Sequence, residues 1–221
     1  PVGVCATHYA VLVSLALWLS LLTASAVISL TPGAGAINTM SNALTVGWRR
    51  SIWGVLGQQL ALLVHILIVA AGAGVLVAGS PMLFNAIRYI GAAYLVYLGI
   101  RLMLSKPTVD TDEASAATRS GESAWSILRR GFWVNLLNPK AIVFFLAFIP
   151  QFIRINEPLL PQYLVLTLTV VGVDVAVMWF FFAAAAKPFR RYVSTVRGQR
   201  ILNTVFGALF IVVAGLLLLM H

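Results

Sequence analysis

The sequence has few charged residues: they make up 10% of its 221 positions, whereas hydrophobic residues make up 61%. Soluble domains typically carry about 25% charged residues, so this composition excludes a domain whose surface faces water. A helix needs about 20 mostly apolar residues to cross a bilayer. Six segments of that length or more hold at most one charged residue each: 9–48, 51–78, 82–100, 131–153, 159–186 and 201–220. Because these runs are continuous and not alternating, we predict an all-α polytopic membrane protein with about six transmembrane helices.

Motifs for covalent or metal chemistry are also missing. The sequence contains no GxSxG, HExxH, GKS/T or CxxC, and its three histidines and single cysteine show no metal-ligand spacing. Cys5, alone, excludes a disulfide framework. The sequence therefore predicts no catalytic residue, no metal site, no cofactor and no ATP-hydrolysing module, so that an ion gradient or a partner would have to drive any pumping.

Positive charge is abundant, with a net charge of +9, but it lies at the ends of the apolar runs. Lysine and arginine there orient membrane proteins, so we interpret the charge as a sign of contact with the lipid bilayer and not with nucleic acid. If 9–48 crosses once, twelve of the fifteen basic residues fall on one side, which is then cytoplasmic, and both termini face outward. The "ASA" at 24–26 resembles a signal-peptidase site, but no basic segment precedes the apolar run, and we expect a retained first span.

One polar linker, 105–124, divides the chain and holds four of its six acidic residues, as expected of a mobile cytoplasmic loop. It separates a first three-helix half, 1–104, from a second, 125–221. A duplicated three-span unit has to insert upside down the second time, which is the inverted-repeat plan of many transporters. Pro32 and Pro139 interrupt the first span of each half at similar distances from its end. This similarity is weak, and it leaves duplication open.

The two interruptions carry the main functional prediction. Proline removes a backbone donor, and Pro32 is followed by Gly33 and Gly35, while Pro139 is preceded by Asn138. Backbone groups freed within a membrane are tolerated where they line a cavity, and paired broken helices indicate a transporter's binding site. The N-termini of the half-helices would suit a carboxylate. The alternative is a pair of kinks that only ease packing.

Ionisable residues inside apolar runs are costly and by default functional. Asp174 and Lys140 both lie about midway through their spans, so that a carboxylate there could carry a proton or hold an ammonium group, balanced by the lysine. The alternative is a fixed structural ion pair. His65 could shuttle protons, with Gln58 two turns earlier on the same face, or could simply bond a neighbouring helix.

Four blocks in order carry a family resemblance: "SLTPGAGAINTM", "GVLGQQLALLVHILIV", "FNAIRYIGAAYLVYLGI" and "GFWVNLLNPKAIVFFLAFIPQF". Together they resemble the lysine-exporter superfamily of amino-acid efflux permeases, and most closely its threonine/homoserine branch. The resemblance implies a bacterial inner-membrane protein that exports amino acids or their derivatives, in exchange for protons. The family's first motif often reads PGP before Asp or Asn, whereas here Pro32-Gly33 precedes Ala34 and the asparagine comes at Asn38. That departure fits the homoserine branch and argues against lysine as substrate.

Our hypothesis is a secondary efflux transporter, and not an enzyme, for small neutral amino acids such as homoserine, its lactone or threonine. Export of leucine, of lysine or of a metal cation is the alternative. The proposed proton-coupling residues are Asp174 and His65. The proposed substrate-binding residues are Pro32, Gly33, Gly35, Asn38, Gln58, His65, Asn138, Pro139, Lys140 and Asp174. A small-residue face, Gly207, Ala208, Ala214 and Gly215, allows close helix packing within one chain or in a homo-oligomer.

Overall fold

The computed structural model describes residues 15–31, 33–79, 81–105, 121–154, 157–188 and 195–219. All regular structure within these ranges is helical, which confirms the predicted all-α class. The named elements in chain order are α2 (Leu15–Leu30), α3 (Ala34–Thr45), α4 (Trp48–Gly79), α5 (Pro81–Leu104), α7 (Ala124–Leu136), α8 (Pro139–Phe148), η1 (Ile149–Phe152), α9 (Leu159–Val175), η2 (Ala176–Ala183) and α11 (Val196–Leu219). Most of the predicted linker, 106–120, lies outside the described residues.

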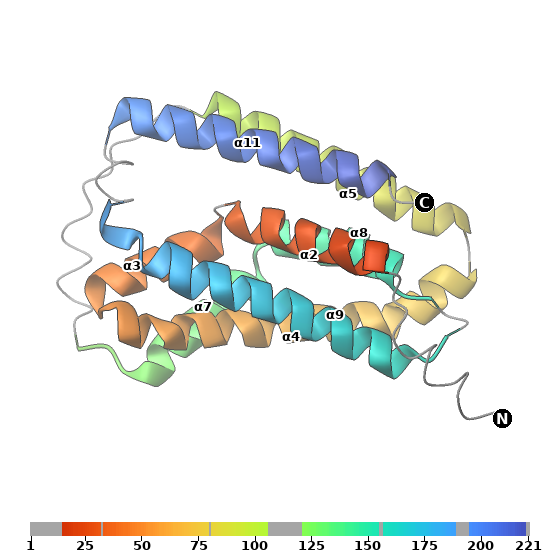
Figure 1. The fold of residues 1–221 in the computed structure, drawn as a ribbon, viewed down its shortest axis with the longest axis horizontal. Helices are drawn as coiled ribbons and strands as arrows, with labels where there is room; N and C mark the ends of the chain where they lie inside the picture. The colour runs from red at the N-terminus through yellow and green to blue at the C-terminus, as the bar shows by residue number, and fades with distance from the viewer. Residues whose placement is uncertain are drawn as a thin grey trace.

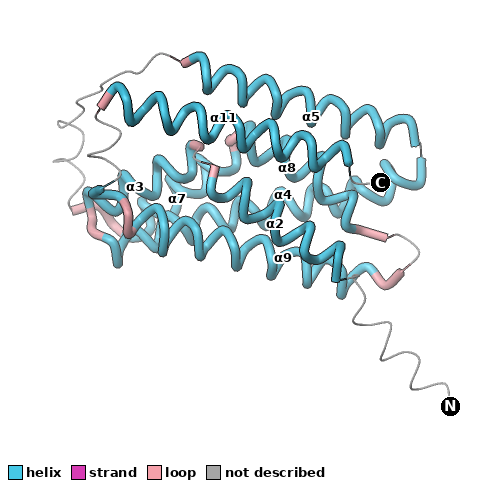
Figure 2. The backbone as a smooth tube through the Cα atoms, turned by 45° about the horizontal axis from the view of Figure 1, so that its top comes forward, coloured by secondary structure: helices cyan, strands magenta, loops and turns pink. Residues whose placement is uncertain are grey.

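Four of the described helices are long and apolar enough to cross a membrane, and two bent pairs raise the number to six if each pair is one span. The straight candidates are Trp48–Gly72, Asn85–Leu104, Leu159–Ala183 and Val196–Leu219. The bent pairs are α2 with α3 and α7 with α8–η1, and each bends by 58°. Figure 2 places the loop segments of both bends in the middle of the bundle. The prediction of a polytopic helical membrane protein is confirmed.

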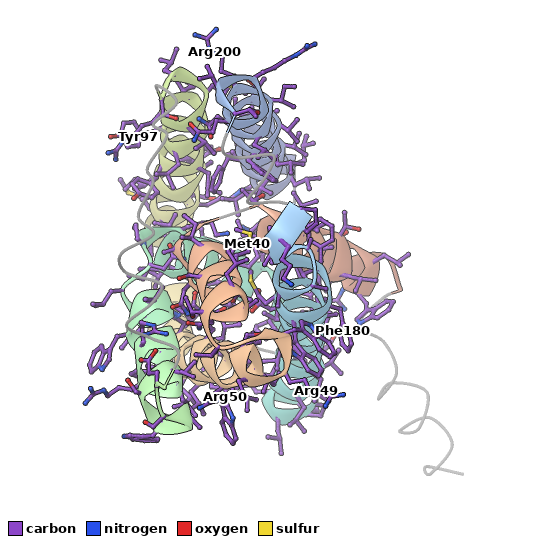
Figure 3. The ribbon with its side chains drawn as sticks, turned by 90° about the vertical axis from the view of Figure 1, so that its left-hand side faces the viewer. Met40, Arg49, Arg50, Tyr97, Phe180 and Arg200 are labelled. Carbon is purple, nitrogen blue, oxygen red and sulfur yellow. The ribbon has the colours of Figure 1, made fainter. Side chains whose placement is uncertain are left out.

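The helix ends that carry basic residues gather at one end of the bundle. In Figure 1, α4 and α11 begin at the left-hand end, and α5 ends there. Figure 3 looks onto this end and labels Arg49 and Arg50 on α4 and Arg200 on α11. In membrane proteins, the end of the helical bundle that carries most lysine and arginine residues usually faces the cytoplasm.

Glycines bring helices of the two chain halves into backbone contact. A Cβ added at Gly57 of α4 would overlap the carbonyl of Leu128 in α7, and one added at Gly131 would overlap the carbonyl of Gly54. On the other side of the bundle, a Cβ at Gly99 of α5 would lie 2.6 Å from the carbonyl of Gly207 in α11. Small residues permit such close approach between membrane helices. Part of the small-residue face on α11 is therefore used within this chain.

An aromatic pair joins the start of α4 to η2. The indole rings of Trp48 and Trp179 stack with centroids 4.7 Å apart and planes 2° from parallel. Trp48 Nε1 donates to the carbonyl oxygen of Trp179 at 3.0 Å, and Trp179 Nε1 donates to the carbonyl oxygen of Trp48 at 3.2 Å. The indole N–H groups thus find partners at the end of the bundle, where tryptophan commonly sits at membrane interfaces.

Candidate transport site

The first break separates α2 from α3. The last helical bond of α2 runs from the amide of Thr31 to the carbonyl of Val27, at 3.1 Å. Pro32 lies outside the described residues, and Gly33 follows as the N-cap of α3 in an extended conformation, without a side-chain cap. The backbone N–H groups in the first turn of α3 therefore have no capping side chain, as the broken-helix hypothesis requires.

The second break separates α7 from α8 and is capped. Pro139 occupies the first turn of α8, where its missing N–H costs nothing. The side chain of Asn138 accepts a hydrogen bond from the amide of Lys140 at 3.1 Å. Asparagine is a favoured N-cap because its side-chain oxygen satisfies one of the free N–H groups of the first turn. The sequence Asn-Pro-Lys thus starts a new helix while it directs the lysine side chain inward.

A small cavity lies where the two broken spans meet α4 and α9. Its volume of about 40 Å³ has room for about three water molecules. Five of the predicted substrate-binding residues are among those that line it: Gly35, Gln58, Asn138, Lys140 and Asp174. Most of its other lining is apolar: Ile28, Ala36, Leu62, Ala141, Phe144, Phe145, Val170 and Met178.

Asp174 lies buried on one wall of the cavity, in the last turn of α9. Its two carboxylate oxygens accept hydrogen bonds from Ser29 Oγ and Gln59 Nε2, both at 2.8 Å. The π-helix η2 begins two residues later, and π-helical turns inside α-helices are frequent at functional sites. Two helices, α2 and α4, thus hold the carboxylate at the cavity.

Lys140 enters the same cavity from α8. Its ammonium donates to the carbonyl oxygens of Ile28, at 3.0 Å, and Thr31, at 2.6 Å, at the end of α2. The alternative of a fixed ion pair with Asp174 is not seen: no direct contact between the two charged groups occurs among the ion pairs of the described residues, which include Arg130–Glu122 and Arg154–Glu157. The two opposite charges share one cavity but are each satisfied by other groups.

Amide side chains form another part of the cavity lining. Gln58 Nε2 donates to the carbonyl of Gly35 and to Thr39 Oγ1, both at 3.0 Å. Asn135 Nδ2 donates to the carbonyl of Gln58 at 3.1 Å. A Cβ added at Gly35 would touch Gln58 Oε1 at 3.4 Å, so the glycine leaves α3 close to α4. Amide groups and the start of α3 thus face the cavity together.

Of the remaining predicted residues, Pro32 lies outside the described ranges, and the lining does not include Gly33, Asn38, His65 or Pro139. Gly33 packs against the end of the Lys140 side chain. His65 stacks on Phe145, a lining residue, at 5.6 Å between ring centroids, with Nε2 3.2 Å from the carbonyl of Leu136 and Nδ1 without a partner. Pro139 is exposed. Asn38 accepts a hydrogen bond from Arg130 Nε at 3.3 Å.

Sequence reasoning missed Ser29, Gln59 and Asn135. Ser29 stands in the "SLTPGAGAINTM" block, but a serine in a membrane helix commonly bonds its own backbone and draws no attention. Gln59 directly follows Gln58 and therefore points to a different side of the helix from His65, whose spacing singled out Gln58. The partner of Gln59 is 115 residues away, so no local pattern reveals it.

A polar network closes the end of the bundle where α3, α4 and α7 meet. Arg130 bonds both carboxylate oxygens of Glu122, at 2.6 and 2.7 Å, and Asn42 Oδ1 at 2.5 Å. Arg50 donates to the Glu122 carbonyl at 2.6 Å. Both bonds to Glu122 come from the single nitrogen Nη1, and such charge-assisted hydrogen bonds are stronger than neutral ones. The network thus ties α3, α4 and the segment before α7 together.

Comparison with known proteins assigns the chain to a family. The chain is 41% identical to an uncharacterized membrane protein of Vibrio cholerae over 87% of this chain and 92% of the relative. It is 36% identical to the homoserine/homoserine lactone efflux protein of Salmonella typhimurium, over 90% and 95%. It is 29% identical to the leucine efflux protein of Klebsiella pneumoniae, over 88% and 91%. No solved structure matches. The family model described as LysE type translocator matches residues 26–221, and the chain belongs to the LysE type translocator family.

Proposed function

We propose that this protein exports small neutral amino acids or their derivatives, with homoserine and homoserine lactone as the first candidates, across a bacterial inner membrane. The observation that carries the proposal is the shared cavity of the two broken spans, whose lining includes one carboxylate, Asp174, one ammonium, Lys140, and the start of α3. Zwitterionic homoserine needs this pairing of charges, whereas its lactone, which has no carboxylate, needs only Asp174 for its ammonium. The family membership and the named efflux relatives support export as the direction.

The lining of the cavity favours a substrate with one positive charge. Within the described lining, Asp174 is the only acidic residue, so a second substrate ammonium would find no second carboxylate and would be repelled by Lys140. The cost of burying an unpaired charge argues against lysine. The apolar lining would also accept a leucine side chain, and the 29% identical leucine efflux relative keeps that substrate as the second candidate.

Proton exchange is the proposed driving force. Asp174 is the buried acid of the cavity, and a carboxylate in a membrane can take up a proton when it releases an ammonium group. His65, stacked on a lining phenylalanine and with one free ring nitrogen, is the proposed relay. The cavity is too small for an amino acid as it stands, so transport requires the broken segments to move.

The proposal is tested with inverted membrane vesicles, in which an exporter moves its substrate inward. Uptake of labelled homoserine into the vesicles is measured with and without a protonophore. We expect uptake into the vesicles that collapses when the proton gradient is removed. Uptake that ignores the gradient would leave a facilitator and refute proton exchange. Vesicles that take up leucine but not homoserine would favour the second candidate. A panel that also includes lysine and divalent cations tests the remaining alternatives, and vesicles without the protein provide the baseline.

A further inference from the structure

Lys140 occupies a cation site that is built mainly from backbone. Its ammonium contacts the carbonyl oxygens of Ile28 and Thr31 at 3.0 and 2.6 Å, both at the C-terminal end of α2. The ring centroid of Phe210 in α11 lies 6.0 Å from the same nitrogen, within the range of a cation–π contact. The carboxylate of Asp174 lines the same cavity. Oxygen dipoles, an aromatic face and a nearby negative charge thus surround one small cation.

Both carbonyls are free because the helix is broken. In a continuous helix the carbonyl of Ile28 would accept from the amide of residue 32, but residue 32 is proline and has no N–H. The carbonyl of Thr31 would accept from residue 35, but the chain bends by 58° between α2 and α3. Free carbonyls at a helix C-terminus carry partial negative charge and attract cations. The proline therefore creates the acceptors that the lysine uses.

We propose that the end of α2 is a binding site for a small monovalent cation, best a primary ammonium, and that Lys140 is its tethered occupant. Half-helix C-termini are places where transporters bind free coupling ions. Here the chain supplies the ion itself, on a side chain from the other broken span. The native protein consequently needs no free sodium or potassium ion at this position, and removal of the tethered ammonium opens the site to a cation from solution.

Thermal unfolding of purified Lys140→Ala tests this site. The variant is compared with the native protein in methylammonium, sodium, potassium and N-methyl-D-glucamine chlorides at equal ionic strength. We expect Lys140→Ala to unfold at a lower temperature than the native protein. Methylammonium at about ten times its dissociation constant should raise the unfolding temperature of the variant by about 3–6 °C. The bulky N-methyl-D-glucamine ion should not raise the unfolding temperature of the variant. If sodium or potassium raises it as well, the site also binds alkali ions.

Two further variants separate the site from general salt effects. Lys187→Ala removes an exposed lysine, and like the native protein it should respond equally to all four salts. Lys140→Met keeps most of the length of the side chain but fills the space with apolar atoms, so methylammonium should not stabilise it. A missing methylammonium effect on Lys140→Ala, or the same effect on all variants, would overturn the proposal.

If Lys140→Ala does not survive extraction from the membrane, the salt series is applied during extraction. Intact protein with methylammonium and none with N-methyl-D-glucamine supports the site, whereas equal loss in both overturns it. None of these measurements depends on export. A failure to transport homoserine therefore leaves this site untouched, and a missing cation effect leaves the proposed substrate untouched.

Discussion

At the scale of single residues, the site is organised by pairs that come from different helices. Asp174 is held by Ser29 of α2 and Gln59 of α4, and Lys140 by the end of α2. Each charge is therefore satisfied before any substrate arrives. A substrate ammonium has to compete for a carboxylate that already accepts two hydrogen bonds, which favours a ligand that brings a full charge.

Replacement of Asp174 by Asn tests the need for that charge. The amide keeps the size of the side chain and can still accept one hydrogen bond, but it cannot hold an ammonium group as an ion pair. A lost hydrogen bond to a charged group is worth about 1.5–3 kcal/mol, so we expect homoserine export to fall about 10- to 100-fold. Initial rates in vesicles with matched protein content measure this.

Glu157→Gln is the matched control for Asp174→Asn. Glu157 is exposed and pairs with Arg154 at 3.2 Å outside the cavity, so its export rate should equal that of the native protein. Normal export by Asp174→Asn would remove the carboxylate from the mechanism. If neither variant protein is found in the membrane fraction, the substitutions affect insertion and not transport.

Sequence reasoning at this scale reached the lining residues but not their partners. Asp174 and Lys140 stand out because a charge inside an apolar run is rare. Their actual partners are a serine, a glutamine and two backbone carbonyls from the first half of the chain. Pairing across more than 100 residues depends on tertiary packing, and the sequence offered only the lost N–H of Pro32 as a clue to the carbonyls.

At the scale of elements, the breaks were predictable and the helix contacts were not. Proline beside glycine or asparagine marked both interruptions, and each bent pair turns by 58°. The equal angles agree with an inverted repeat of three plus three helices, which stays a prediction. The backbone contact of α4 with α7 depends on Gly57 and Gly131, which sit in different halves and share no local pattern.

Substitution of Gly57 by Ala tests the contact between α4 and α7. The new methyl group would overlap the Leu128 carbonyl, a backbone atom that cannot move aside alone. Forced overpacking costs about 1–3 kcal/mol, so we expect lower resistance to thermal unfolding in detergent. Gly172→Ala in α9 is the control, because nothing lies within 4 Å of its added Cβ. The control should match or slightly exceed native stability, by up to about 1 kcal/mol. Equal stability of the two variants would contradict the contact.

At the scale of the whole molecule, the helix ends that carry Arg49, Arg50 and Arg200 lie at one end of the bundle (Figures 1 and 3). This end is the predicted cytoplasmic side, and the count of spans then puts both termini outside. Alkaline phosphatase fused after His221 should be active, and green fluorescent protein at the same position should stay dark. The same two reporters inserted in the linker 105–124 should behave in the opposite way. A fluorescent C-terminal fusion would mean an odd number of crossings or a reversed orientation.

The glycine contacts also limit how the molecule moves. They join α4 to α7 and α5 to α11, and each pair has one helix from either half. A movement of one whole half against the other would pull both contacts apart. We therefore expect the exchange between inward and outward access to involve the broken segments around the cavity and the π-helical turn beside Asp174.

The hydrogen bond between Gln59 and Asp174 has a consequence for biosynthesis. The two residues are 115 positions apart, and a ribosome needs about 6–23 s to add that length of chain. For this time α4 is complete and Gln58 already has its partners in α3, but Gln59 lacks Asp174 of α9. An unpaired amide side chain is unfavourable in the lipid interior. We therefore expect the newly made first half to stay in the insertion machinery, or with a chaperone, until the second half has been made.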